Sequence, residues 1–112
     1  MTTRLFIYGS LKRGRDAAFR MSGATFLRVA TTLPEWTLLN LGRYPGLVPG
    51  SDSVEGELYH VPDDLLARLD DYEGVAEGYY DRVPITLADG TECQTYRYTG
   101  ERSEARPHGP AW

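Results

Sequence analysis

Residues 4–14 of the chain read Arg4-Leu5-Phe6-Ile7-Tyr8-Gly9-Ser10-Leu11-Lys12-Arg13-Gly14. The apolar run from Leu5 to Tyr8 is too short and too uniformly apolar for an amphipathic helix. It therefore predicts a central strand that is buried on both faces. A Gly-Ser turn follows the strand, and basic residues follow the turn. This order leaves backbone N–H groups at the end of a buried strand beside positive charge, an arrangement that suits a small anion.

The size and composition of the chain indicate one globular domain. Its 112 residues are 41% hydrophobic and 25% charged, which is ordinary for a soluble protein with a core of its own. We expect a single domain over residues 1–100 and a polar, flexible tail over residues 101–112. The net charge of −4 and the scattered basic residues argue against a nucleic-acid partner.

Few side chains of this sequence bind metals or undergo redox chemistry. Cys93 is the one cysteine, so no intramolecular disulfide can form, and His60 and His108 lack the spacing of metal ligands. The sequence therefore predicts neither a metal nor a cofactor. It contains no run long and apolar enough to cross a membrane, and its start lacks the layout of a signal peptide. We expect a cytoplasmic protein without a membrane partner.

Hydrophobic periodicity and turn residues predict the other elements. The clearest helix runs from Pro62 to Glu73, with acidic residues in its first turn and Gly74 after its end. Residues 44–50, which are rich in proline and glycine, indicate a loop. Strands are expected over residues 29–33, 36–41, 54–61, 79–87 and 92–98, with an Asp89-Gly90 hairpin turn between the last two. This pattern is typical of a small α+β domain with a closed or nearly closed sheet.

One acidic residue of this helix faces the apolar side. At about 100° per residue, the helix leucines and Tyr72 form the core-facing stripe, and Glu73 falls inside it. The helix dipole disfavours a carboxylate in the last turn by about 0.3–1 kcal/mol. Burial penalises its charged form, and the neighbouring Asp70 adds like charge. Together these effects predict a raised pKa for Glu73, which suits a general base near neutral pH.

Structural explanations compete with these functional ones. A helix frays in its last turn, so Glu73 can also turn into solvent, and Asp70, Asp71 and Glu77 are expected to form a solvated acidic face. Ser10 has no base near it in the sequence, so a role in the turn is preferred over that of a nucleophile.

Other candidate side chains also have a structural interpretation. Cys93 is expected to be a buried small residue, and His108 is expected to be idle. Five tyrosines are compatible with a ligand pocket, but packing on sheet faces is the preferred interpretation for most of them: Tyr44, Tyr79, Tyr80, Tyr96 and Tyr98.

Several motifs follow one another in a specific order. Tyr8-Gly9-Ser10-Leu11-Lys12-Arg13-Gly14 follows the first strand, Leu69-Asp70-Asp71-Tyr72-Glu73-Gly74 ends the helix, and Tyr79-Tyr80-Asp81-Arg82-Val83 begins the next strand. Between them stand Tyr44-Pro45-Gly46-Leu47 and Val54-Glu55-Gly56-Glu57-Leu58-Tyr59. In this order the motifs resemble the γ-glutamylcyclotransferase-like family. The resemblance is to its short members, the γ-glutamylamine cyclotransferases and the bacterial cyclotransferases that remove a γ-glutamyl protecting group.

The resemblance implies a fold, a reaction and a set of site residues. The implied fold is a small mixed β-barrel with flanking helices. The implied reaction cleaves a γ-glutamyl amide by attack of the substrate's own α-amine and releases 5-oxoproline and a free amine. Glu73 matches the family's general base, and Tyr8, Gly9, Ser10 and Leu11 match its anion-binding turn. Such a ring closure needs no enzyme nucleophile, metal or cofactor, which agrees with the composition.

Two other functions are compatible with the sequence. A binding module would hold a small carboxylate metabolite at the Gly9–Leu11 turn without turnover. An interaction domain would use an exposed tyrosine-rich face. For the enzyme, free γ-glutamyl amino acids, γ-glutamyl-ε-lysine and γ-glutamylated natural products all fit as substrates, and the sequence leaves the oligomeric state open.

Overall fold

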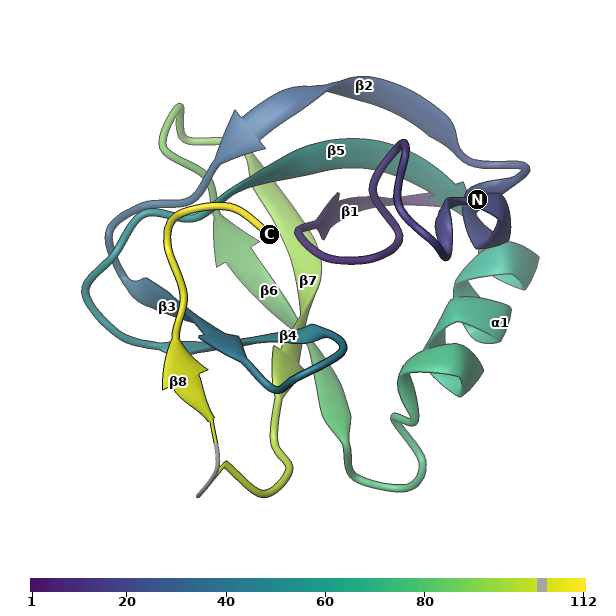
Figure 1. Cartoon of the computed structure of the whole chain (residues 1–112). Coiled ribbons are helices and arrows are strands. Elements are labelled where there is room, and N and C mark those ends of the chain that lie inside the picture. Colours follow the sequence, from purple (N-terminus) through teal and green to yellow (C-terminus); the bar gives the residue numbers. More distant parts are fainter. Residues whose placement is uncertain (103–104) are drawn as a thin grey trace.

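The strands of the protein form one mixed sheet with an α-helix beside it (Figure 1). The computed structural model describes residues 1–102 and 105–112. In chain order the elements are β1 (Thr2–Ile7), the 3₁₀ helix η1 (Ala18–Met21), β2 (Thr25–Thr31), β3 (Trp36–Asn40), β4 (Pro45–Pro49), β5 (Glu55–Pro62), α1 (Asp63–Glu73), β6 (Tyr80–Thr86), β7 (Glu92–Tyr98) and β8 (Arg106–Pro107).

Strand β1 lies in the middle of the sheet. The hydrogen-bonded order is β2-β5-β1-β7-β4-β3-β8, and β6 pairs with β7 off this path. Strand β1 runs antiparallel to β5 and parallel to β7. Its side chains alternate between two buried clusters, since Leu5 and Ile7 belong to one and Phe6 and Tyr8 to the other. This arrangement confirms the expected central strand that is buried on both faces.

The sheet curls without closing into a barrel. Among the described strands, β2 and β6 meet at an isolated bridge between Thr32 and Leu87, next to a 2.8 Å hydrogen bond from the Ala88 N–H to the Thr31 carbonyl. The bridged residues lie just beyond the ends of both strands, so no continuous ladder joins β2 to β6. The α+β class and the mixed, barrel-like sheet are confirmed, and of the two expected alternatives the sheet is nearly closed, not closed.

Strand β4 corrects the loop expected over residues 44–50. It pairs antiparallel with β3 and parallel with β7. Its prolines, Pro45 and Pro49, stand at its two ends, where a missing N–H does least harm to a ladder. A Cβ added at Gly46 would lie 2.8 Å from the Cβ of Tyr98, so glycine lets β4 approach β7 closely. Here the turn-forming residues serve tight strand packing.

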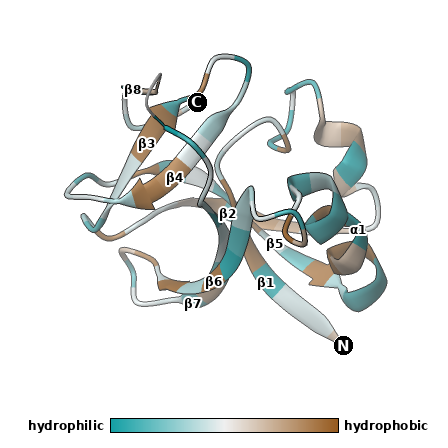
Figure 2. Ribbon diagram, turned by 90° about the horizontal axis from the view of Figure 1, so that it is seen from below, coloured by the Kyte–Doolittle hydropathy of each residue, from teal (hydrophilic) through white to brown (hydrophobic). Residues whose placement is uncertain are grey.

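Helix α1 packs its leucine face toward β5 and β1. The extended Pro62 precedes it, and Asp63 and Asp64 occupy its first turn, where the dipole favours negative charge. Its leucines are buried as predicted (Leu65, Leu66 and Leu69). Apolar and polar residues alternate along its ribbon in Figure 2. The assignment of Tyr72 to the core stripe is wrong, because this side chain is 40% exposed.

The last part of the chain returns along β3. Strand β8 pairs with β3, on the opposite side of the molecule from α1 (Figure 1). The His108 N–H donates to the Leu38 carbonyl (2.8 Å), and the Pro110 carbonyl accepts from the Glu55 N–H (2.7 Å). The domain boundary expected at residue 100 and the expected flexibility of residues 101–112 stay predictions.

No helix in the described parts is long and apolar enough to cross a membrane.

Candidate active site

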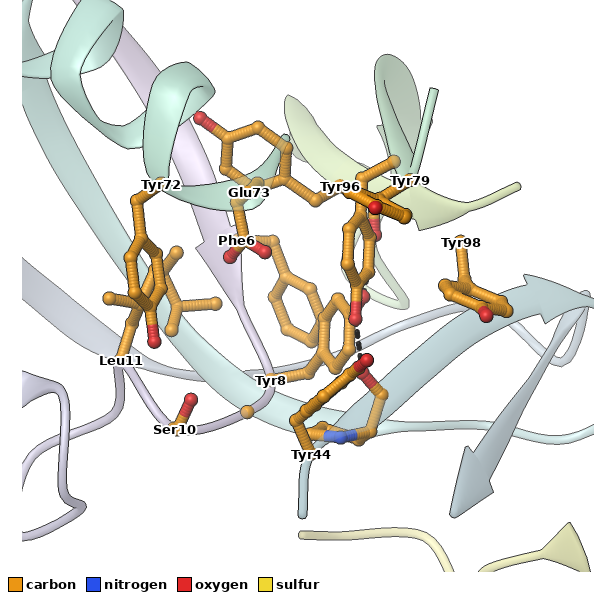
Figure 3. A pocket seen from close by; sticks show the side chains of 14 residues that line it. Phe6, Tyr8, Ser10, Leu11, Tyr44, Tyr72, Glu73, Tyr79, Tyr96 and Tyr98 are labelled. Atoms are coloured by element: carbon orange, nitrogen blue, oxygen red, sulfur yellow. Dashed lines mark hydrogen bonds between the residues drawn. The ribbon is translucent and has the colours of Figure 1, made fainter. Parts of the chain in front are cut away.

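A cavity of about 290 Å³ opens beside the end of β1 (Figure 3). The loop after β1, the end of α1, the turn before β4 and strands β6 and β7 supply its walls. All five site residues predicted from the sequence line it: Tyr8, Gly9, Ser10, Leu11 and Glu73. The fold thus brings the first turn and the end of the helix to one cavity, although they lie far apart in the sequence.

The end of α1 fixes the direction of Glu73, its last residue. Gly74 is left-handed, with φ 72°, and its N–H donates to the Asp71 carbonyl at 3.1 Å. The Val75 N–H donates to the Asp70 carbonyl at 3.1 Å. These two bonds form a Schellman closure, which ties down the last helical turn. The Glu73 side chain is half-buried and lines the cavity, in contrast to the alternative of a frayed end that turns into solvent.

The carboxyl group of Glu73 lies among apolar and aromatic side chains. Burial raises its pKa from the ordinary 4.5 to about 7. The direction agrees with the prediction, and burial is its cause. Within the described residues no hydrogen bond or ion pair engages this carboxyl group. It is therefore available to a ligand.

Asp70 has partners of its own and does not belong to a solvated face. Its two carboxylate oxygens accept from Arg82, from Nε at 3.0 Å and from Nη2 at 3.1 Å. The Tyr96 hydroxyl donates to the same carboxylate at 2.7 Å. The expected acidic face is thus wrong for Asp70, because the start of β6 supplies a cation that the helix pattern does not reveal. Asp71 and Glu77 are exposed, as expected.

Residues 9–12 form a tight turn at the edge of the cavity. The Lys12 N–H donates to the Gly9 carbonyl (3.0 Å), and the Ala17 N–H donates to the Ser10 carbonyl (3.1 Å). No hydrogen bond found in the described residues uses the N–H of Ser10 or Leu11. A pair of unused N–H groups in a turn is a nest for an anion. The geometry fits the predicted anion-binding turn, whose role stays a prediction.

Glu57, which the sequence analysis missed, anchors the loop that contains this turn. It lies on β5 and is 7% exposed. Its carboxylate accepts from the backbone N–H of Arg13 (3.0 Å), from the Arg13 Nε (3.1 Å) and from the Tyr59 hydroxyl (2.9 Å). Burial works to raise the pKa of Glu57, but these hydrogen bonds outweigh it and hold the pKa below the ordinary value. The sequence signal that could have identified Glu57 is an acidic residue at an inward-facing position of a largely apolar strand.

Tyr8 uses its hydroxyl group within the protein. It donates to the Tyr96 carbonyl at 2.7 Å and accepts from the Leu47 N–H at 3.2 Å. These bonds tie the end of β1 to β7 and β4. What Tyr8 offers to the cavity is therefore its ring. The neighbouring Gly9 is needed for close packing, since an added Cβ would lie 2.8 Å from the Cγ of Pro45.

Tyrosine is the dominant lining residue. Seven of the eight tyrosines of the chain line this cavity: Tyr8, Tyr44, Tyr72, Tyr79, Tyr80, Tyr96 and Tyr98. The preferred interpretation of packing holds for Tyr80, Tyr96 and Tyr98, which pack in a core cluster of the sheet, but these side chains line the cavity as well. In the sequence these tyrosines are clustered within the motifs. Hydrophobic periodicity alone does not distinguish a tyrosine that lines a pocket from one that packs on a sheet face.

The remaining candidates lie outside the cavity lining, apart from Ser10, which takes part in the turn described above. Cys93 is 7% exposed, and burial raises the pKa of its thiol to about 11, which confirms the expected buried residue. The His108 ring packs on Trp112 with centroids 4.9 Å apart. Over residues 1–102 and 105–112, no group of three or more His, Cys, Asp and Glu side chains could hold a metal ion.

Comparison with known proteins agrees with the family resemblance of the motifs. Residues 5–112 match the family model described as gamma-glutamyl cyclotransferase, AIG2-like. The chain belongs to this family. A crystal structure of an AIG2-like protein from Mus musculus superimposes with a TM-score of 0.86 at 26% identity, and the match covers 99% of this chain and 88% of that one.

Two curated bacterial relatives have similar sequences. The gamma-glutamylcyclotransferase family protein YtfP of Escherichia coli K12 is 39% identical over 67 residues, which are 60% of this chain and 58% of that protein. The gamma-L-glutamyl-butirosin B gamma-glutamyl cyclotransferase of Niallia circulans is 34% identical over 91 residues, 80% of this chain and 56% of that protein. The chain thus matches between about half and two thirds of the length of its curated relatives. These names support gamma-glutamyl cyclotransferase activity in general.

Proposed function

We propose that the protein is a γ-glutamyl cyclotransferase that converts a γ-glutamyl amide into 5-oxoproline and a free amine, with Glu73 as general base. One observation carries this proposal: a carboxyl group with a pKa of about 7 lines the same cavity as the Ser10–Leu11 turn. A pKa near neutrality lets one group accept a proton and later return it. The name of the Niallia circulans relative supports the same class of reaction.

In the proposed reaction, Glu73 first accepts a proton from the substrate's α-ammonium group. The α-nitrogen then attacks the γ-carbonyl carbon, closes the five-membered ring and places negative charge on the carbonyl oxygen. The bond between this carbon and the leaving nitrogen breaks as the carbonyl re-forms. The α-nitrogen loses two protons in total, and Glu73 relays both to the amine, which leaves as an ammonium ion. General acid–base help of this kind contributes about 10²–10⁴-fold.

The Ser10–Leu11 turn would position the substrate. We assign its N–H groups to the α-carboxylate of the glutamyl group, which would hold the α-nitrogen near Glu73 and fold the substrate for attack. The same groups aimed at the γ-carbonyl would instead stabilise the oxyanion. A substrate whose α-carboxylate is replaced by a neutral amide separates these roles. Carboxylate binding predicts mainly a higher KM, and an oxyanion role predicts an unchanged KM.

The proposal is tested by release of 5-oxoproline from a panel of γ-glutamyl amines. We expect Glu73→Gln to lower kcat by about 10²–10⁴-fold, whereas Glu77→Gln, which removes an exposed acid of the same kind, keeps the wild-type rate. For the wild type, kcat/KM should rise with pH through about 7, because only the ionised Glu73 accepts a proton. Full activity of Glu73→Gln would refute the role of the base. Binding without 5-oxoproline in the wild type would favour a binding module.

A further inference from the structure

The last residues of the chain return to the loop that follows β1. In Figure 1 the segment after β8 crosses the molecule toward this loop. On the way, the His108 N–H donates to the Leu38 carbonyl (2.8 Å), and the Glu55 N–H donates to the Pro110 carbonyl (2.7 Å). The segment is therefore tied to β3 and to the start of β5 before it reaches Trp112.

The main-chain oxygen of Trp112 is shared by two cationic side chains of this loop. It accepts from the Lys12 Nζ at 3.1 Å and from the Arg15 Nη2. In the described parts of the chain, neither cation forms an ion pair with a carboxylate side chain. Burial and the charge of Arg15 lower the pKa of Lys12. An acceptor that both cations share therefore offsets their repulsion.

The indole ring of Trp112 fixes the position of this oxygen. The side chain is half-buried and packs against the core cluster that contains Phe6 and Tyr8. The His108 ring packs on it as well, with centroids 4.9 Å apart. Any residue at position 112 would provide a main-chain oxygen, but the ring anchors it beside the loop.

The contacts of Trp112 reach the Ser10–Leu11 turn through the main chain of the loop. The Lys12 N–H donates to the Gly9 carbonyl (3.0 Å) and so closes the turn, and the Arg15 N–H donates to the Lys12 carbonyl (3.1 Å). Trp112 thus holds the side chains of two residues whose main chain shapes the turn.

A second anchor acts on the same loop from the sheet. Glu57 on β5 accepts from the main-chain N–H and from the Nε of Arg13, which lies between Lys12 and Arg15 in the sequence. None of these residues, nor Trp112, lines the cavity. Any effect of Trp112 on a substrate must therefore pass through the loop.

We propose that Trp112 is a positioning residue of the active site, which holds the Ser10–Leu11 turn in the shape that binds the substrate's α-carboxylate. The inference rests on the proposed function for the role of the turn. In the absence of the ring, Lys12 and Arg15 would lose their common acceptor, and the two unused N–H groups would no longer point steadily at one ligand.

Two substrates separate this positioning role from a general loss of stability. One is a γ-glutamyl amide, and the other is the same amide with its α-carboxylate replaced by a neutral carboxamide. The release of the free amine is measured for both. We expect Trp112→Ala to raise KM for the carboxylate substrate about 10-fold, the scale of one hydrogen bond to a charged group, with a smaller change in kcat. The KM for the carboxamide should stay close to that of the wild type.

Trp36→Ala is the matched control for this variant. Trp36 is also half-buried and packs against the same core cluster, but it lies on β3, which pairs with β4 and β8. Both alanine variants should lose stability, and only Trp112→Ala should lose its preference for the α-carboxylate. Trp112→Phe retains a ring in the core and should retain the wild-type KM.

Amide hydrogen exchange over residues 9–17, followed by mass spectrometry, gives a second readout that does not depend on turnover. The N–H groups of Lys12, Arg15 and Ala17 are hydrogen-bonded within the loop, so their exchange reports its opening. We expect faster exchange in Trp112→Ala than in Trp36→Ala. Equal exchange in the two variants would overturn the inference.

An unchanged KM in Trp112→Ala, or an equal rise for both substrates, would also overturn the inference and leave the proposed reaction standing. If the wild type releases no amine from either substrate, the proposed reaction fails. Equilibrium binding then replaces KM, and only weaker binding of the carboxylate substrate by Trp112→Ala supports the inference. Trp112→Leu takes the place of the alanine variant if circular dichroism shows that Trp112→Ala is unfolded.

Discussion

Replacing Glu73 by glutamine should stabilise the fold at alkaline pH while it removes the proposed activity. A glutamate of the unfolded chain ionises near its ordinary pKa of 4.5, whereas burial raises the pKa of Glu73 to about 7 in the folded protein. Between these pH values the folded state binds more protons than the unfolded state. The stability of the wild type therefore falls as the pH rises through this window, and the penalty is complete above about pH 7. The side-chain amide of the Glu73→Gln variant does not ionise, so the variant escapes this penalty.

The size of the effect follows from the two pKa values. Their difference corresponds to roughly 3 kcal/mol in the free energy of unfolding, at about 1.36 kcal/mol for each tenfold change in the proton affinity. Solvent in the cavity reaches the half-buried carboxylate and lowers this figure, so we expect about 1–3 kcal/mol. For a domain of this size, that corresponds to a rise of several degrees in Tm.

Urea unfolding of the wild type and Glu73→Gln between pH 5 and pH 9, followed by circular dichroism, measures this difference. Titration of the other groups cancels when the two proteins are compared at each pH. The gap between them should widen up to about pH 7–8 and then level off. Glu77→Gln, a change of the same chemistry at an exposed site, should show no such widening. A gap of constant size across the range would refute the desolvation of the Glu73 carboxyl group.

Three further substitutions probe how the site is held. Gly74→Ala should cost about 1–3 kcal/mol in thermal unfolding and lower kcat, because φ is 72° there and the new Cβ would lie 2.6 Å from the Tyr79 ring; an unchanged Tm would contradict this. Asp70→Asn should cost about 1–2 kcal/mol in urea unfolding, since Arg82 loses its charged partner; a stability equal to that of the wild type would show that the pair contributes nothing. Glu57→Gln should raise KM several-fold with a smaller change in kcat, because it loosens the loop that carries the proposed anion site; steady-state kinetics with unchanged KM would exclude this positioning role.

The elements that the sequence predicted well are those in which local and tertiary preferences agree. The run Leu5–Tyr8 offers apolar side chains to both faces, and the structure places core clusters on both faces of β1. Helix α1 has Pro62 before it, acids in its first turn and Gly74 after it, and each of these signals acts locally. Glu73 could be singled out because its angular position depends only on the helix itself.

The features that the sequence did not predict depend on distant partners. Strand β4 forms because β3 and β7 flank it, and Gly46 fits against Tyr98, so its prolines and glycine are no longer turn signals. Asp70 is neutralised by Arg82 from another element. The bonds of Glu57 likewise depend on a loop far away in the sequence. No window of neighbouring residues contains these pairings.

Asp70 and Glu73 offer a comparison within one helical turn. Both are acids near the end of α1, and both are partly removed from solvent. For Asp70 the fold supplies a two-point ion pair from Arg82 and a hydroxyl group from Tyr96. Around Glu73, strands β6 and β7 supply tyrosine rings, and no partner for its carboxyl group lies within the described residues. The unpaired carboxylate lowers the stability of the fold, and a nearby cation would remove this cost. A carboxyl group needed only for the fold would have an ion-pair partner, as Asp70 has. A carboxyl group that is left unpaired in a cavity, with its pKa raised to about 7, is suited to exchange protons with a substrate.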